Sequence, residues 1–329
     1  TAHTTFDFWC LMPARTGKAK ADAGRFQKKP NKKAAVRKRK DRERPSIPEV
    51  EPLYSTYAAP KPEGAYYDED AANHAVEWIE SLVHFKGRWA GTPFYLMAWQ
   101  ARIVREIFGW MREDATRLYR NVYVEAPRKS GKTSLAAAVA LYLAYGDDEA
   151  SPEVYFAAYD KDQAKLCYMT ARYMLEQDKE LFEQTAIYNS SHQMLLKENP
   201  GGLLKVLSAE GSGKFGLNAH GIIFDELMTQ KNRDLWDALS TGQAAREQSL
   251  QFNISTAGWD RMSVCFEQHE LVRQISEGVT EDPYFFGAVF GAPMDADWQD
   301  EEVWKQANPS LGETSSIDLY REKATKAAN

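Results

Sequence analysis

The side chains best suited to chemistry lie in EAPRKSGKTSLAAAVA, residues 125–140. Its Gly131-Lys132-Thr133 closes the phosphate-binding pattern G-x-x-x-x-G-K-[ST], although Ala126 stands where that pattern has its first glycine. In such a loop, backbone N–H groups bind phosphate, the lysine reaches the β- and γ-phosphates, and the hydroxyl holds Mg²⁺. An alanine can replace the first glycine if its φ stays negative. The residues predicted to bind ATP or Mg²⁺ here are Gly131, Lys132, Thr133 and Ser134.

Two acids follow a second strand-like run. The segment HGIIFDEL places Asp225 and Glu226 directly after three apolar residues. A phosphate loop needs such a partner, because Asp225 would orient the Mg²⁺ shell and Glu226 would polarise the attacking water. By itself, an acid pair at a strand end is as often a solvated turn. Combined with the loop, the pair predicts ATP hydrolysis with Lys132 and Glu226 as catalytic residues.

Three weaker signals accompany these motifs. LQFNISTAGW ends a strand in Ser255-Thr256-Ala257, whose hydroxyls could sense the γ-phosphate and couple hydrolysis to movement. Gln100 carries an amide that both donates and accepts hydrogen bonds, which suits an adenine edge. EGSGKFG also contains G-K, but Phe215 replaces the required hydroxyl, so Lys214 is either solvated or faces a neighbouring subunit's nucleotide. Each signal alone is common in unrelated proteins.

The charge of the chain is unevenly distributed. The net charge of −6 combines +10 in residues 1–44, which hold fourteen Lys or Arg, with about −16 in the remainder. A basic arm on an acidic body indicates contact with nucleic acid or an acidic partner, the alternative being a solvated leader. Three cysteines without C-x-x-C spacing favour a reducing cytoplasm over disulfides or a zinc site. No apolar run is long enough to predict a membrane span, and no secretory signal is recognisable.

Hydrophobic periodicity predicts an α/β fold in three parts. Residues 1–64 are expected to be the basic arm and a proline-rich linker, and residues 65–260 the ATPase core with a helical segment on the adenine side. Residues 261–329 follow this core. Short apolar runs alternating with helices predict a mainly parallel β-sheet flanked by helices. The predicted strands are 121–126, 154–159, 203–208, 221–226 and 250–256, with another in YFFGAVFG.

Taken in order, these motifs resemble the ATPase half of the large terminase subunit of tailed bacteriophages, over residues 78–320. The resemblance includes HFKGRWAGTPFYLMAWQ on the adenine side, APRKSGKTS as a deviant phosphate loop, FGLNAHGIIFDEL, NISTAG and ANPSLGETSSI. Lack of the first glycine is usual in this family, which favours a working site. The resemblance implies a RecA-like P-loop NTPase with an N-terminal helical segment. It also implies that residues 261–329 form a small C-terminal lid subdomain and the start of a linker.

The resemblance also implies roles for individual residues. Gln100 would contact adenine, and Arg128 would contact phosphate or sense hydrolysis. The segment Ser255 to Ala257 would couple hydrolysis to motion. Because the motor of this family is a ring, a basic residue of the neighbouring subunit would complete each site. The candidates for this trans-acting residue are Lys214, Arg233 and Arg246.

By resemblance, the chain would translocate double-stranded DNA into a procapsid in the host cytoplasm, together with the portal protein and the small terminase subunit. If an isolated domain remains monomeric, its ATP hydrolysis is expected to be slow, because the basic residue of the neighbouring subunit is missing. Large terminases also carry a nuclease domain, for which residues 258–329 leave no space. We therefore expect that this chain does not cut DNA, and that it is part of a longer protein or is processed near residue 329.

Three other functions share some of these features. A helicase-like ATPase has similar motifs, but it needs a second RecA domain for which the chain has no space. A non-hydrolysing ATP- and DNA-binding module would keep the basic arm, yet Lys132, Thr133 and Glu226 are all intact. A small-molecule kinase would need a substrate pocket and lid, which no upstream segment resembles.

Overall fold

The computed structural model describes residues 43–208, 217–230 and 233–328. The basic arm expected in residues 1–44 falls almost wholly outside these ranges. Lys214, one of the candidates for a trans-acting residue, also lies outside the described residues.

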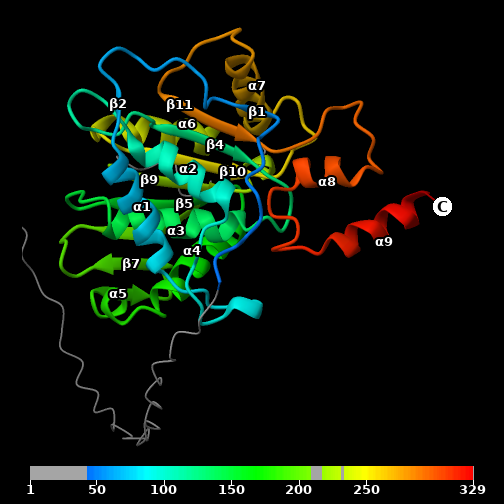
Figure 1. Cartoon of the computed structure of the whole chain (residues 1–329). Helices are drawn as coiled ribbons and strands as arrows, with labels where there is room; N and C mark the ends of the chain where they lie inside the picture. Colours follow the sequence, from blue (N-terminus) through cyan, green and yellow to red (C-terminus); the bar gives the residue numbers. More distant parts are fainter. Residues whose placement is uncertain (1–42, 209–216, 231–232, 329) are drawn as a thin grey trace, which may run out of the picture. The chain divides into compact units, whose positions relative to one another are not determined.

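A large sheet forms the centre of the described structure (Figure 1). Its strands follow the order β1 (Tyr54–Ser55), β11 (Phe285–Val289), β4 (Asn121–Glu125), β10 (Leu250–Ser255), β9 (Gly221–Asp225), β5 (Glu153–Ala158), β8 (Leu203–Ser208), β7 (Gln193–Leu196) and β6 (Thr185–Tyr188). The strands from β11 through β8 pair in parallel, whereas β1, β7 and β6 pair antiparallel at the two edges. The central strands β9 and β10 are buried along their whole length, which explains their continuous apolar runs.

Helices cover both faces of the sheet because side chains along each strand alternate between two cores. In β4, Val122 and Val124 face one core, and Tyr123 between them faces the other. The first core is covered by α1 (Glu69–Ser81), α2 (Ala98–Gly109), α3 (Lys132–Tyr145) and α4 (Lys161–Leu175). The second is covered by α6 (Asp234–Gly242) and α7 (Val264–Ser276). In Figure 1, α1 and α2 lie in front of the sheet.

The remaining elements are short except for α9. They are β2 (Tyr66–Tyr67) paired with β3 (Trp110–Met111), the helices α5 (Lys179–Glu183), α8 (Glu301–Ala307) and α9 (Ile317–Ala328), and the 3-10 turns η1 (Gly87–Trp89), η3 (Leu227–Thr229) and η4 (Gln243–Ala245). In Figure 1, α8 and α9 lie beside the sheet, near the C-terminus. Among the described residues, none of the helices combines the length and apolar character that a membrane crossing needs.

The predicted fold class is confirmed by these elements. The predicted strands coincide with β4, β5, β8, β9 and β10 to within one residue at each end. The antiparallel hairpin of β6 and β7 was not predicted. Its strands are four residues each and only partly buried, so their apolar alternation is too weak to stand out.

Two predicted boundaries differ from the structure. Within the expected linker, β1 pairs with β11 and Thr56 is buried, so this segment belongs to the sheet. Farther along, β11 pairs with β4 and α7 packs on the sheet, although both were expected in the lid. Neither pairing leaves a local pattern in the sequence, because the paired strands are far apart in the chain. β1 has only two residues, and its partner β11 lies more than two hundred positions away.

Replacing Thr56 by valine tests whether this segment is part of the fold. The Thr56 hydroxyl accepts a hydrogen bond of 3.0 Å from the buried N–H of Gly287. We expect Thr56→Val to lower the free energy of unfolding by about 1–3 kcal/mol, because a buried N–H would lose its partner. Denaturant unfolding measures this loss. Ser46→Val, an exposed change in the same segment, is the control, and equal stability of the two variants would contradict the assignment.

Candidate active site

The topology brings the predicted motifs to one edge of the sheet. β4, β10 and β9 are adjacent and parallel, so the segments that follow them begin side by side. These segments are the loop after β4, Thr256 after β10, and Glu226 after β9. Parallel α/β sheets bind their ligands beyond the carboxyl ends of such strands.

The loop after β4 has a conformation suited to anion binding without its first glycine. Ala126 is buried and keeps a negative φ, while the positive φ values of the loop fall at Lys129 (68°) and Gly131 (91°). Gly131 is the N-cap of α3, and no side chain of the described residues caps this helix. Its first backbone N–H groups are therefore available to an anion. Ala126, which stands where the pattern has glycine, is therefore compatible with the turn that the loop makes.

Lys132 is buried inside this loop. It is 4% exposed, and Nζ donates to the backbone carbonyls of Ala126 and Pro127 at 2.9 Å each. Burial lowers the pKa of Lys132, and the nearby carboxylates of Glu226 and Asp225 oppose this shift. An ammonium has three N–H donors, so one remains for Glu226, 4.0 Å away, or for a ligand.

Asp225 ends β9 and faces the first turn of α3. The residue is 6% exposed, and its carboxylate lies near the Thr133 hydroxyl, which favours the ionised form. Burial raises the pKa of Asp225 to about 6, and the Thr133 hydroxyl partly opposes this shift. The Oδ1 atom is buried without a hydrogen-bond partner among the described residues. Such an oxygen is unfavourable unless a proton or a cation binds it.

Glu226 follows with a backbone conformation that is uncommon outside glycine. Its φ of 57° and ψ of 55° lie in the left-handed region, a form of strain found at functional sites. The carboxylate accepts hydrogen bonds from the Thr256 N–H at 3.2 Å and from the Thr256 hydroxyl at 3.0 Å. The side chain remains 31% exposed. Its direction is therefore fixed while water can still reach it.

Ser255 has a different role from Thr256. Its buried hydroxyl accepts from the Met228 N–H at 3.0 Å and donates to the Thr256 carbonyl at 2.8 Å. Met228 lies in η3, just after Glu226, so Ser255 ties the end of β10 to the segment after β9. Ala257 is exposed. Of the predicted coupling segment, only Thr256 makes a described hydrogen bond to the Glu226 side chain.

A pocket of about 300 Å³ adjoins Gly131. Gln100 is buried at the start of α2, and its Oε1 accepts from the Met97 N–H at 3.1 Å. Its Nε2 lies so close to Gly131 that a Cβ added there would meet it at 3.2 Å. The lining residues include His84, Arg88, Trp89, Phe94, Tyr95, Met97, Gln100, Gly131, Ser134 and Glu313. Aromatic walls with one amide beside a phosphate loop can hold a nucleotide base.

Residues far along the chain contact the loop after β4 and line part of this pocket. Ser310 Oγ donates to the Ser130 carbonyl of the loop at 2.8 Å and accepts from Trp99 Nε1 at 3.0 Å. Glu313 lies 4.0 Å from the Arg88 guanidinium. The segment ANPSLGETSSI therefore lies against the loop itself, although Ser310 and Ser130 are 180 positions apart in the sequence.

The arginines predicted to act at the site, in the same chain or in a neighbour, have different surroundings in the structure. Arg128 is exposed on the loop after β4. Arg233 is half-exposed and pairs with Glu267 at 2.5 Å. The Arg246 side chain is 9% exposed and bonds to Glu149 at 2.6 Å and to several backbone carbonyls. These contacts within its own chain argue against Arg246 as a residue that completes a neighbour's site.

Sequence reasoning missed one polar group at this edge. Glu125, the last residue of β4, is buried, and its Oε2 lies 3.1 Å from Nδ1 of His269 in α7. No motif marks this pair, because its members are distant in sequence. A charged residue ending an otherwise apolar strand was the only available signal.

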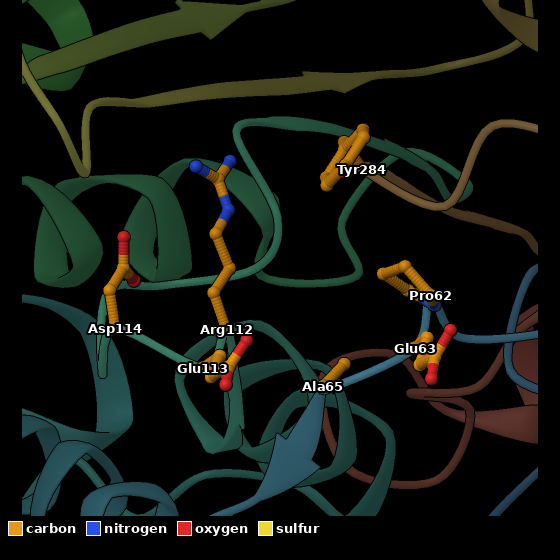
Figure 2. Close-up of a pocket in the computed structure, with 7 residues that line it drawn as sticks. All are labelled: Pro62, Glu63, Ala65, Arg112, Glu113, Asp114 and Tyr284. Carbon is orange, nitrogen blue, oxygen red and sulfur yellow. The ribbon is translucent and has the colours of Figure 1, made fainter.

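A second hollow, of about 400 Å³, lies near the amino ends of β4 and β11 (Figure 2). It is lined by Pro62, Glu63, Ala65, Arg112, Glu113, Asp114 and Tyr284. The Arg112 guanidinium lies 5.1 Å from the centre of the Tyr284 ring and points away from the Glu113 carboxylate. None of the predicted site residues lines this hollow, because they lie at the opposite edge of the sheet.

Known proteins resemble this chain in sequence and in structure. The family model "Terminase large subunit, ATPase domain" matches residues 98–274, more than half of the chain. The chain is 31% identical to the "Terminase, large subunit" of Enterobacteria phage HK97 over 209 residues, 61% of this chain and 39% of that protein. It is 28% identical to "Protein YmfN" of Escherichia coli (strain K12) over 125 residues, 38% of this chain and 26% of that protein. These matches take in less than half the length of either relative.

Among solved structures, the HK97 bacteriophage large terminase matches with a TM-score of 0.66 at 25% identity. The match covers 78% of this chain and 51% of that chain. It supports the same mainly parallel sheet flanked by helices. The chain therefore belongs to the terminase large subunit family, of which it carries the ATPase domain.

Proposed function

We propose that this chain hydrolyses ATP to drive translocation of double-stranded viral DNA into a procapsid. The observation that supports hydrolysis is the convergence of Lys132, Asp225 and Glu226 at one edge of the sheet. A buried ammonium, a buried carboxylate and a partly exposed carboxylate are the groups that phosphoryl transfer to water requires. Family membership supports the DNA-packaging role, since packaging motors are built on this domain.

The residues present fit a magnesium ion. Thr133 offers a hydroxyl, and Asp225 offers the buried Oδ1 that has no partner among the described residues. Mg²⁺ takes oxygen ligands, usually one or two carboxylates together with phosphate oxygens and water. When bound, the ion would neutralise charge on the β- and γ-phosphates. A cation at Oδ1 would also oppose the burial effect that raises the pKa of Asp225.

Each side chain then has a defined task. The N–H groups at the start of α3 and the Lys132 ammonium would bind phosphate. Glu226, held in direction by Thr256, would orient the attacking water and accept its proton. Gln100 would contact adenine, and Arg128 would contact phosphate or sense hydrolysis. Because the Thr256 N–H and hydroxyl both donate to the Glu226 carboxylate, a movement of that carboxylate during hydrolysis would be transmitted to β10.

Translocation requires partners beyond this chain. We expect a ring of copies on the procapsid in the host cytoplasm, with the portal protein and the small terminase subunit as further partners. Contacts with DNA would be mainly to phosphate, hence independent of sequence and weakened by salt, and the basic arm carries suitable charge. Lys214 or Arg233 of a neighbouring copy would complete each site. The ATPase core would run from β1 through β11, with the lid after it.

Glu226→Gln is expected to abolish hydrolysis while preserving ATP binding. The amide keeps the shape of the side chain but cannot accept a proton from water. We expect phosphate release to fall by about 10²–10⁴-fold, with the Kd for Mg-ATP little changed. Phosphate release from the purified chain, measured over a range of protein concentrations, checks this expectation.

Glu198→Gln, the same change at an exposed position, is the matched control and should retain full activity. Activity that rises more steeply than linearly with concentration would support completion of the site by a neighbour. Binding of Mg-ATP without any release above the Glu226→Gln background would instead favour a non-hydrolysing ATP-binding module.

Asp225→Asn is expected to stabilise the metal-free chain while removing activity. Because the pKa of Asp225 rises from 3.8 to about 6 on folding, the free energy of unfolding falls as pH increases through that window. In EDTA near pH 8, the variant should exceed the wild type by about 1 kcal/mol or more, since it carries no buried charge. Near pH 4 the difference should shrink. Denaturant unfolding at both pH values measures it, and a difference independent of pH would refute this account.

A further inference from the structure

Polar side chains cross the core that lies between the sheet and α7. This core is built mainly of apolar residues such as Phe224 and Val272. Within it, the Tyr123 hydroxyl donates to Glu125 Oε2 at 2.7 Å and lies 3.2 Å from Cys265 Sγ. Tyr123 and Glu125 come from β4, and Cys265 comes from the first turn of α7.

The contacts continue to the active-site edge. Cys265 Sγ donates its single thiol proton to Ser255 Oγ at 3.5 Å, so its 3.2 Å approach to the Tyr123 hydroxyl is a close polar contact. The Ser255 hydroxyl in turn accepts from the Met228 N–H and donates to the Thr256 carbonyl. Thr256 binds the Glu226 carboxylate through both its N–H and its hydroxyl. The contacts therefore run without a break from β4 to Glu226.

His269 holds the other end of this series. Its Nδ1 lies 3.1 Å from Glu125 Oε2, the same oxygen that accepts from Tyr123. Glu125 is only 5% exposed. Its carboxylate contacts Tyr123 from β4 and His269 from α7, so groups from two elements hold it in place. The hydrogen bond to Glu125 raises the pKa of His269, which favours the protonated imidazole next to that carboxylate.

The polar residues of β10 follow the same face. Gln251, Asn253 and Ser255 alternate along the strand and are all fully buried. Gln251 Nε2 donates to Asn253 Oδ1 at 3.2 Å, and Asn253 Nδ2 donates to the Val122 carbonyl of β4 at 2.8 Å. The second of these bonds joins β10 to β4 beneath the segment that carries Thr256.

Such a network is not the most stable way to fill a core. Buried polar groups lose hydration and contribute little net stability, and apolar residues of the same shape often serve as well. What a completed network provides is one defined geometry. Glu226 needs such a defined geometry, because its backbone lies in the left-handed region and the direction of its carboxylate depends on Thr256.

We propose that the relay formed by Tyr123, Glu125, His269, Cys265 and Ser255 positions Glu226 for catalysis through Thr256. These are positioning residues, because the relay reaches the catalytic carboxylate only through another side chain. The kinetic consequence rests on the proposed ATP hydrolysis. The structural consequence, a fixed segment around Met228 and Thr256, does not.

Tyr123→Phe removes one hydroxyl from the middle of the relay. We expect kcat for ATP hydrolysis to fall by about five- to tenfold while the Kd for Mg-ATP stays within about twofold, as for loss of a positioning hydrogen bond. In the nucleotide-free chain, hydrogen exchange at the Met228 and Thr256 amides should accelerate by about fivefold or more. Both amides donate to side chains at this edge.

Tyr155→Phe is the matched control. The Tyr155 hydroxyl donates to Glu153 Oε2 at 2.6 Å, the same kind of pair two residues apart on β5, at the amino end of the strand. This variant should leave kcat and both amides unchanged. A second pair of variants guards against misfolding: His269→Asn keeps a donor near the position of Nδ1 and should retain more activity than His269→Leu.

The outcomes separate the relay from the proposed function. Exchange at Met228 and Thr256 that stays at the wild-type rate in Tyr123→Phe would overturn the relay, whether or not the chain hydrolyses ATP. Faster exchange with an unchanged kcat would overturn the claim that the relay positions Glu226. A wild-type chain without ATPase activity would refute the proposed function, and the exchange rates would still decide whether the relay fixes this segment.

Discussion

The parallel register of β4, β10 and β9 is the constraint on which the rest of the structure depends. Ser255 of β10 is paired with Glu125 of β4, and Ile254 is paired with Asp225 of β9. The three strands therefore end at nearly the same level, and the loops that follow start within hydrogen-bonding reach of one another. A slip of one residue would turn every side chain of a strand to the opposite face.

This register also divides the work between the two faces of the sheet. On one face, α3 is buried along almost its whole length by apolar residues, which makes it a rigid support for the loop that precedes it. On the other face, polar side chains of β4, β10 and α7 meet beneath Thr256. Apolar packing sets how closely elements approach, whereas hydrogen bonds set the direction of a particular side chain.

The active-site edge keeps several groups in unfavourable surroundings. Burial lowers the pKa of Lys132 and raises that of Asp225, and Glu226 has a left-handed backbone. Each of these features opposes folding of the chain. Such combinations of burial, perturbed pKa and strain are typical of sites that act on ligands.

The places of the loop after β4, of the acid pair after β9 and of the central strands were predictable from the sequence, because apolar runs and motif spacing are local properties of the chain. The two-residue strand β1, the place of β11 beside β4, and the contact of Ser310 with the loop were not, because they join distant residues without a local pattern. The same limit applies to side chains. Arg233 and Arg246 are equivalent in the sequence, and only packing leaves one half-exposed while satisfying the other with acceptors of its own chain. Residue types determined which chemistry was available to this protein, and tertiary structure decided which groups were brought together, since burial and hydrogen-bond partners exist only after folding.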